Sequence, residues 1–286
     1  MKESNFLKEI LAKKKQRLEQ QKLVLPETEL KARIKDLPPA RAFLTAINKP
    51  KTISLIAELK RSSPSHPNLR LDLDVVNIAK QYEEAEVAAI SVLTEEEYFH
   101  GSLTDLKQVK EAVSLPVLRK DFIIEPYQVF ESKVFGADAI LLIAELLSRQ
   151  QLVELISLTH SLGMDCLVES HQEKQLKKVL SLKITATSQI ESVQKTNKTD
   201  KHLKKNIDFA IGINNRDLAT LQVDLKTTEK LFPLVPKERI VVVESGINCY
   251  QDILFLKILG VNAVLVGTAI LKSPDVKSAI YDLMGH

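Results

Sequence analysis

Two lysines and three glutamates stand at the ends of segments that otherwise have the character of buried strands. Glu58 and Lys60 alternate within "IAELK", while Lys120, Glu169 and Glu244 occur in "VLRK", "LVES" and "VVVE". Side chains two apart on a strand point to the same face, so Glu58 and Lys60 should lie side by side. A lysine that is desolvated or near cations loses basicity and becomes a usable acid, while a neighbouring glutamate can stay ionised as a base. The set predicts proton transfer, with Schiff-base formation by Lys60 or Lys120 as the alternative.

Small residues follow the last two of these segments. "ESGI" and "VGTAI" place Ser245, Gly246, Gly267 and Thr268 where backbone N–H groups can approach an anion, which predicts a phosphate site. Further polar residues at or just after predicted strand ends are Ser63, Arg119, Asp121, Asn214, Asn215 and Arg216. Burying so many polar groups without partners would cost several kcal/mol each. We therefore expect them to pair with one another or with a ligand.

Eight short runs of β-branched and apolar residues recur along the chain, with amphipathic segments between them. They cover residues 53–60, 88–94, 116–122, 139–146, 165–170, 209–215, 239–246 and 263–270. Such continuous apolar runs are typical of parallel strands buried on both faces. Several helical segments end at a glycine, namely Gly136, Gly163 and Gly260, where a left-handed cap is expected. The pattern predicts an α/β fold, a (β/α)8 TIM barrel, with an open doubly wound sheet as the alternative.

Two segments fall outside this repeat. Residues 1–48 are expected to form an N-terminal extension of three helices. An apolar stripe on the first helix, which includes Leu7 and Ile10, should pack on the barrel. Residues 49–286 then form the barrel. A polar insertion at about 183–206, rich in Lys, Thr, Ser and Asn, joins the fifth helix to the sixth strand. We expect it to be solvated at the end of the barrel opposite the active face.

Composition limits the class of protein further. Forty Lys and Arg residues against thirty-seven Asp and Glu leave a net charge of +3, which argues against a nucleic-acid partner. The apolar runs are shorter than the ~18 residues of a membrane span, and the N-terminus lacks the core of a signal peptide. Cys166 and Cys249 have no metal-type spacing. We expect a cytoplasmic protein that binds no metal.

The ordered motifs resemble indole-3-glycerol-phosphate synthase, a carbon–carbon lyase of tryptophan biosynthesis. They are "KARIKDLPPARAF", "IAELKRSSPS", "AISVLTEEEYFHGSLTDL", "LPVLRKDFIIEPYQV", "GADAILLIAELL", "LVES", "IGINNRDLATLQVDL", "VVVESGI" and "GVNAVLVGTAIL". The resemblance implies ring closure, decarboxylation and dehydration of 1-(2-carboxyphenylamino)-1-deoxyribulose 5-phosphate to indole-3-glycerol phosphate. It implies a phosphorylated small-molecule substrate and no cofactor. We expect a monomer, with association with other enzymes of the tryptophan pathway as the alternative.

The resemblance also implies roles for single residues. Lys120 resembles the general acid that protonates the ketone oxygen, and Lys60 the second lysine, close to phosphate and substrate carboxylate. Glu169 resembles the base, with Glu58 assisting it and Glu244 in the same polar network. The other implied site residues are Asn214, in the catalytic set, and Arg216 for the polar end of the substrate; Ser63, Ser245, Gly246, Gly267 and Thr268 for the phosphate; and Phe99, Phe122 and Leu141 as the wall for the anthranilate ring.

Two positions depart from the family pattern. His66 and Pro67 stand where the family usually has Lys-Gly, and Thr268 stands where it usually has Glu or Ser. The nearest alternatives are phosphoribosylanthranilate isomerase and the tryptophan synthase α subunit, neither of which explains paired lysines together with the N-terminal extension. A binding or regulatory barrel without catalysis is the alternative from a different class. The joint presence of Glu58, Lys60, Lys120 and Glu169 argues against it.

Overall fold

Eight parallel strands close into a barrel in the computed structural model, which describes residues 5–184, 208–218 and 220–286. The strands are β1 (Ser54–Leu59), β2 (Ala89–Leu93), β3 (Val117–Lys120), β4 (Ala139–Ile143), β5 (Asp165–Ser170), β6 (Ala210–Asn214), β7 (Val241–Glu244) and β8 (Ala263–Val266). β8 pairs in parallel with β1, with Ser54 opposite Ala263, so the sheet has no edge. The predicted TIM barrel is confirmed. Four predicted runs were too long by three or four residues, because β3, β4, β7 and β8 are shorter than the runs at 116–122, 139–146, 239–246 and 263–270.

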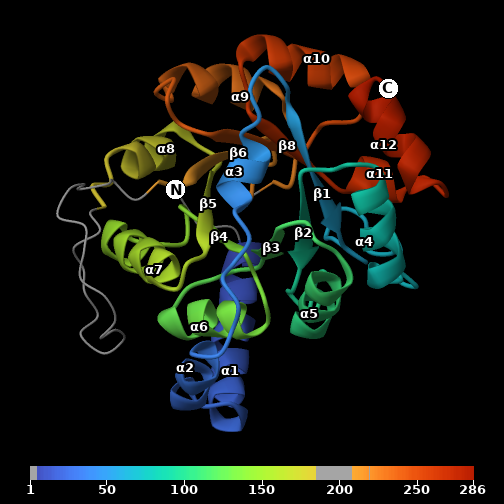
Figure 1. Cartoon of the computed structure of the whole chain (residues 1–286). Helices are drawn as coiled ribbons and strands as arrows, with labels where there is room; N and C mark the ends of the chain where they lie inside the picture. The colour runs from blue at the N-terminus through green and yellow to red at the C-terminus, as the bar shows by residue number, and fades with distance from the viewer. Residues whose placement is uncertain (1–4, 185–207, 219) are drawn as a thin grey trace, which may run out of the picture.

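Helices surround the strands (Figure 1). They are α4 (Val75–Glu84), α5 (Leu103–Ala112), α6 (Pro126–Val134), α7 (Arg149–Ser161), α8 (Glu173–Leu180), α9 (Lys226–Leu231) with the 3-10 turn η1 (Phe232–Leu234), α10 (Tyr250–Leu259), α11 (Thr268–Leu271) and α12 (Val276–Met284). Gly136, Gly163 and Gly260 have φ of 88°, 73° and 98°, which confirms the predicted left-handed caps. α12 packs beside α4 and closes the ring of helices. None of the helices in the described part of the chain is long and apolar enough to cross a membrane.

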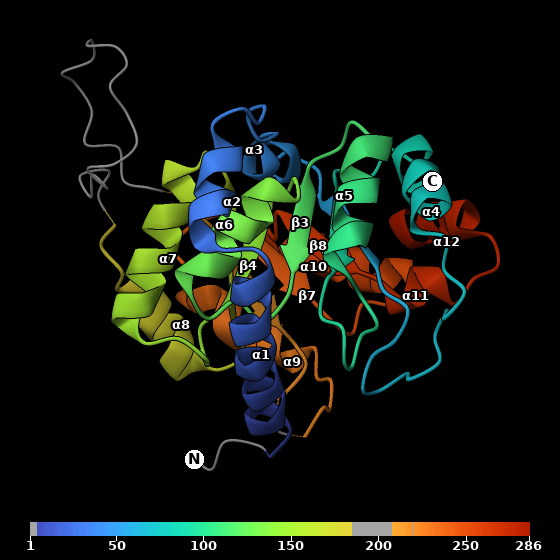
Figure 2. The ribbon, with the colours of Figure 1, turned by 90° about the horizontal axis from the view of Figure 1, so that it is seen from below.

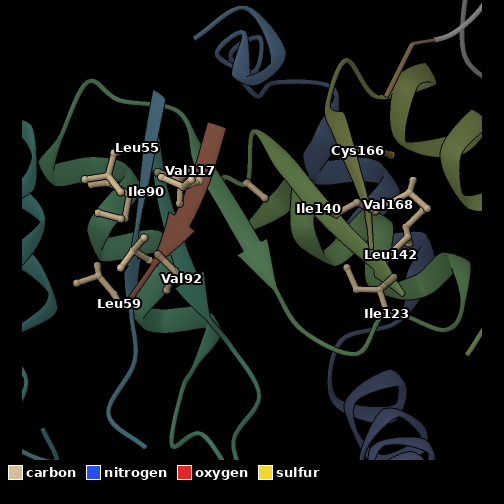
Figure 3. Close-up of a cluster of buried hydrophobic side chains, with 14 of the residues drawn as sticks. Leu55, Leu59, Ile90, Val92, Val117, Ile123, Ile140, Leu142, Cys166 and Val168 are labelled. Atoms are coloured by element: carbon tan, nitrogen blue, oxygen red, sulfur yellow. The ribbon is translucent and has the colours of Figure 1, made fainter. Parts of the chain in front are cut away.

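Strand alternation divides the core into two layers. Outward side chains such as Leu55, Val92 and Val168 are buried under the helices (Figure 3). Inward side chains such as Leu118 and Leu167 fill the barrel itself. Nearer the carboxyl ends of the strands the inward positions become polar, and this change of chemistry along each strand places the candidate site at that end.

Three N-terminal helices follow the barrel from one end to the other (Figure 2). They are α1 (Asn5–Val24), α2 (Glu27–Ile34) and α3 (Phe43–Ile47). Lys14 of α1 forms a buried ion pair with Asp121, just after β3, at 2.8 Å. α2 packs on α6, and at the opposite end the Leu44 N–H of α3 donates to Asp165 Oδ2, at the start of β5, at 2.9 Å. Of the insertion predicted at 183–206, residues 185–206 lie outside the described residues.

Candidate active site

Four charged side chains form one layer inside the barrel mouth. Glu58, Lys120, Glu169 and Glu244 come from β1, β3, β5 and β7, and alternate strands supply one layer of side chains in this fold. Lys120 Nζ lies 3.2 Å from Glu169 Oε2 and 3.2 Å from Glu244 Oε2. Gly212 on β6 makes room for this cluster, because a Cβ there would lie 2.9 Å from Glu244 Oε1. A Gly within the sixth strand was a signal that sequence reasoning missed.

Lys120 and the two glutamates in contact with it, Glu169 and Glu244, differ in their pKa shifts. Burial lowers the pKa of Lys120, but the carboxylates of Glu169 and Glu244 outweigh it and hold that pKa well above its usual range. Burial raises the pKa of Glu169, but the charges of Lys120 and His171 hold it well below its usual range. Burial and the nearby Glu169 raise the pKa of Glu244 to about 8. The expectation that desolvation or nearby cations reduce the basicity of such a lysine is therefore wrong for Lys120, because its nearest charges are carboxylates and these outweigh burial.

Glu58 and Lys60 lie side by side, as their spacing predicts. Glu58 Oε1 is 2.6 Å from Lys60 Nζ. Gly267 after β8 permits this position, because a Cβ there would lie 2.7 Å from Glu58 Oε1. The backbone carbonyl of Glu58 accepts a hydrogen bond from the Tyr82 hydroxyl at 3.2 Å, which ties the end of β1 to α4. The pair is therefore held in place from two sides.

A cavity of about 330 Å³ opens at this end of the barrel. Its lining includes every residue predicted for catalysis or binding, namely Glu58, Lys60, Ser63, Phe99, Lys120, Phe122, Leu141, Glu169, Asn214, Arg216, Glu244, Ser245, Gly246, Gly267 and Thr268. The rings of Phe99 and Phe122 are 6.4 Å apart between centroids and tilted by 48°. Asn214 Nδ2 donates to Glu169 Oε1 at 3.0 Å, and Arg216 Nη1 donates to the Leu221 carbonyl at 2.8 Å. One cavity thus brings a pair of aromatic rings together with the lysines and carboxylates of the charged layer.

Several cationic side chains line the cavity, among them Lys60, Arg216 and Lys272. Burial lowers the pKa of His66, and the charges of Lys272, Lys60 and Arg216 lower it further. Ser245 and Gly246 have φ of 65° and 83°, a conformation in which successive N–H groups can converge on an anion. His66 and Lys272 line the cavity and were missed as site residues. Lys272 follows the four-residue helix α11, most of which lies within the strand predicted at 263–270.

Some charged residues at strand ends do not serve the cavity. Arg119 neighbours Lys120 but points to the other face of β3, where it pairs with Glu131 of α6 at 2.9 Å. Asp121 also borders the cavity, but its carboxylate is paired with Arg119 at 3.0 Å. Arg119 is therefore paired with protein carboxylates, as expected for a buried polar group, but it does not face the cavity. Arg61, at the start of the "RSSPS" segment, likewise pairs with Asp105 of α5 at 2.6 Å.

One histidine in contact with the cluster was missed by sequence reasoning. His171 Nε2 lies 2.9 Å from Glu169 Oε1, and His171 Nδ1 lies 3.1 Å from Glu145 Oε2. The signal was present only in part, because His171 stands two residues after Glu169 but one residue beyond the end of β5, in a bend before α8. Glu169 is therefore in contact with Lys120 through one oxygen and with His171 and Asn214 through the other.

The closed barrel, with lysines and carboxylates facing one cavity at the carboxyl ends of its strands, defines a (β/α)8-barrel enzyme of small-molecule metabolism. Residues 7–188 and 189–283 match the family described as Indole-3-glycerol phosphate synthase. A relative of that name from Dehalococcoides mccartyi (strain CBDB1) is 44% identical over 270 residues, covering 93% of this chain and 95% of the relative. Another from Rhodopirellula baltica is 41% identical over 279 residues, covering 98% of each chain.

The chain belongs to the indole-3-glycerol phosphate synthase family. Its activity is accordingly that of a decarboxylating carbon–carbon lyase of tryptophan biosynthesis. Among solved structures, 3-hexulose-6-phosphate synthase from Salmonella typhimurium is similar with a TM-score of 0.59, covering 82% of this chain and 97% of that chain. At 13% sequence identity this similarity supports the barrel fold alone.

Proposed function

We propose that the cavity binds 1-(2-carboxyphenylamino)-1-deoxyribulose 5-phosphate with each chemical part of the substrate at a matching set of residues. The anthranilate ring lies against Phe99, Phe122 and Leu141, which are apolar and adjoin the charged layer. The phosphate lies at Lys60 and at the N–H groups of the segments after β7 and β8. The residues for that anion are Ser63, Ser245, Gly246, Gly267 and Thr268. Asn214 and Arg216 hold the polar groups between the two ends.

Lys120 is the acid of the ring-closing step in this proposal. As the ring carbon that bears the carboxylate bonds to the ketone carbon, the carbonyl electrons move to oxygen, which takes the proton of Lys120. The bond to the carboxylate then breaks, carbon dioxide leaves, and its electron pair returns to the ring system. In the dehydration the hydroxyl leaves as water with a proton from an acid, for which Lys60 is placed, and Glu169 accepts a proton as base. Glu58 orients Lys60 through their 2.6 Å contact.

One observation carries the assignment of Lys120. Its ammonium lies between Glu169 and Glu244 inside the cavity, so it is held protonated at neutral pH and faces the space that a substrate enters. General acids positioned in this way contribute about 10²- to 10⁴-fold to rate. Glu244 has a raised pKa, so at neutral pH it can remain protonated and uncharged when Lys120 gives up its positive charge.

Product formation tests the proposal directly. Purified protein is mixed with the carboxyphenylamino-deoxyribulose phosphate, and the rise of indole fluorescence and the release of carbon dioxide are followed together. We expect both to appear at equal rates and in equal amounts. Binding of the substrate without either product would contradict the enzyme assignment and leave only a phosphate-binding barrel.

The organisation around the barrel is part of the proposal. Residues 1–48 act as an extension that anchors to residues 49–286 through contacts such as Lys14 with Asp121 and Leu44 with Asp165. Cys166 and Cys249 are both free thiols, as a reducing compartment such as the cytoplasm would keep them. All groups invoked for catalysis come from one chain, so we propose that a monomer is active, which the sedimentation of active protein tests.

A further inference from the structure

His171 lies between two carboxylates just behind the charged layer. Its Nε2 is 2.9 Å from Glu169 Oε1 and its Nδ1 is 3.1 Å from Glu145 Oε2, while its side chain is only 3% exposed. The position is fixed from the backbone as well, because the His171 N–H donates to Glu145 Oε1 at 2.9 Å. A neutral imidazole has one nitrogen with a lone pair, which would face a carboxylate oxygen here. Two carboxylates at these distances therefore favour the doubly protonated, cationic ring.

The contacts of His171 are those of charge with charge. Each ring nitrogen is within ion-pair distance of a carboxylate oxygen, one from Glu145 and one from Glu169. Burial lowers the pKa of His171, but Glu145 and Glu169 outweigh burial and raise it to about 10. The ring is thus a buried cation at neutral pH, and its two partners supply the compensation that such a charge needs.

His171 extends the charged layer into a chain of alternating charge. The order is Glu145, His171, Glu169, Lys120 and Glu244, which are negative, positive, negative, positive and, when ionised, negative. Glu169 is the link, since one of its oxygens contacts Lys120 and the other contacts His171. A change of charge at Lys120 therefore alters the electrostatic environment of Glu169, which keeps His171 as a second cationic partner.

We propose that His171, held by Glu145, is a positioning residue that shares the charge of Glu169 and thereby lets Lys120 give up its proton to the substrate. This inference rests on the proposed role of Lys120. Without His171, Lys120 would be the only cation among the described residues in ion-pair contact with Glu169 and would hold its proton more tightly. Once Lys120 had lost its charge, no cation in the described part of the chain would pair with Glu169 to stabilise its ionised form, and the pKa of Glu169 would rise. His171 touches neither substrate nor reacting atoms in this account.

Replacement of His171 by Gln, which removes the charge and keeps a polar side chain, is the first test. Because an opposite charge at this distance shifts a carboxyl pKa by about 1–3 units, the acid limb of the kcat profile should move up by about that amount. We expect kcat at neutral pH to fall about tenfold, the equivalent of about one pKa unit, with KM within about twofold. His171→Lys, which restores a cation, should return the acid limb toward its wild-type position. The charged groups that bear on this limb are Glu145, Glu169, Lys120, Glu244, Glu58 and Lys178.

Glu145→Gln tests the other half of the device. It removes one of the two carboxylates that keep His171 charged, so the pKa of His171 should fall and the ring should lose its proton at a lower pH than in the wild type. We expect kcat to decline on the alkaline side at a lower pH, while kcat on the acid side stays close to wild type. His160→Gln, at a half-buried histidine on α7, is the matched control and should leave both limbs in place.

The outcomes separate this inference from the proposed function. A purely structural role for His171 would lower kcat and the thermal midpoint of His171→Gln without moving either limb, and that result would overturn the inference. So would a wild-type kcat and pH profile in His171→Gln. If Lys120→Ala proves fully active, the role of Lys120 fails first. An inactive Lys120→Ala beside an unperturbed His171→Gln rejects only the role of His171.

Discussion

The ammonium of Lys120 lies 3.2 Å from a carboxylate oxygen of Glu244, although the two residues come from strands on opposite sides of the barrel. Their side chains meet because inward positions of alternate strands share one layer. Lys120 would therefore carry two anionic neighbours if Glu244 were ionised together with Glu169. The raised pKa of Glu244 lets the cluster change its net charge near neutral pH. Ionisation of Glu244 is therefore coupled to the charge of Lys120, because loss of that positive charge disfavours the Glu244 carboxylate.

Glu244→Gln should remove a pH-dependent loss of stability. The pKa of Glu244 is about 8 in the folded protein and about 4.5 in an unperturbed carboxyl, so between these values only the folded chain holds the proton. The free energy of unfolding therefore decreases as the pH rises from about 4.5 to about 8, and this contribution is constant above. The free energy of unfolding of Glu244→Gln, relative to that of the wild type, should therefore increase as the pH rises from about 4.5 to about 8. Thermal midpoints of both proteins at about pH 5 and about pH 9 check it, and an unchanged difference would contradict it.

Gly267→Ala should disturb the phosphate end of the cavity through Glu58. The φ of Gly267 is −128°, which any residue can adopt, but the added Cβ would lie 2.7 Å from Glu58 Oε1. Glu58 must then move away from Lys60. We expect KM for the phosphorylated substrate to rise about tenfold, the equivalent of one lost interaction of about 1.4 kcal/mol. Steady-state kinetics measure this change.

Gly163→Ala is the matched control for that variant. Gly163 has φ of 73° with no atom within 4 Å of an added Cβ. This replacement should cost about 1–2 kcal/mol of stability, from the left-handed backbone alone, and leave KM unchanged. A wild-type KM in Gly267→Ala would show that Glu58 is not held as described.

Phe122→Leu should weaken binding of the aromatic part of the substrate. Leucine keeps the apolar character of this buried position but has no ring face, and a ring pair is worth about 0.5–1.5 kcal/mol beyond its buried area. We expect KM to rise about 2- to 10-fold with kcat nearly unchanged, and the same direction for Phe99→Leu. Phe209→Leu, at a buried phenylalanine just before β6, should leave KM alone. An equal effect at Phe209 would point to a general loss of packing.

Lys14→Ala should loosen the N-terminal extension. Lys14 is buried and bonds both Asp121 at 2.8 Å and Glu96 at 3.2 Å, but Asp121 keeps Arg119 as a partner when Lys14 is lost. We therefore expect a loss of about 1–3 kcal/mol in the free energy of unfolding and faster proteolytic cleavage within residues 1–48. Lys15→Ala, at an exposed position on the same helix, should cleave like the wild type. Equal cleavage rates in the two variants would argue against Lys14 as an anchor.

The barrel could be predicted because its signals are local. Each strand is a short apolar run, and Gly136, Gly163 and Gly260 end their helices with the left-handed backbone that only glycine adopts without strain. The spacing of two between Glu58 and Lys60 also fixed their shared face. His171 lies one residue beyond the end of β5, in a bend, so the same rule could not fix its direction relative to Glu169.

The protonation states of the charged groups in the site could not be predicted from local sequence signals. Lys120 meets Glu169 and Glu244 only because the sheet closes, and no local pattern states which charges are nearest. That is why the expected loss of basicity at Lys120 was wrong. The position of Arg119, in contrast, could have been predicted. Side chains alternate along β3, so Arg119 points to the outer face, opposite to Lys120, where it pairs with Glu131.

The turnover of Lys120→Ala tests the central claim most directly. Substrate binding is measured by titration and product formation by indole fluorescence, with Lys110→Ala as a control far from the cavity, where Lys110 pairs with Asp138. We predict that Lys120→Ala binds the substrate and loses turnover by about 10²- to 10⁴-fold, the range of a general acid. Turnover within about tenfold of the wild type would contradict the assignment of Lys120 as the acid.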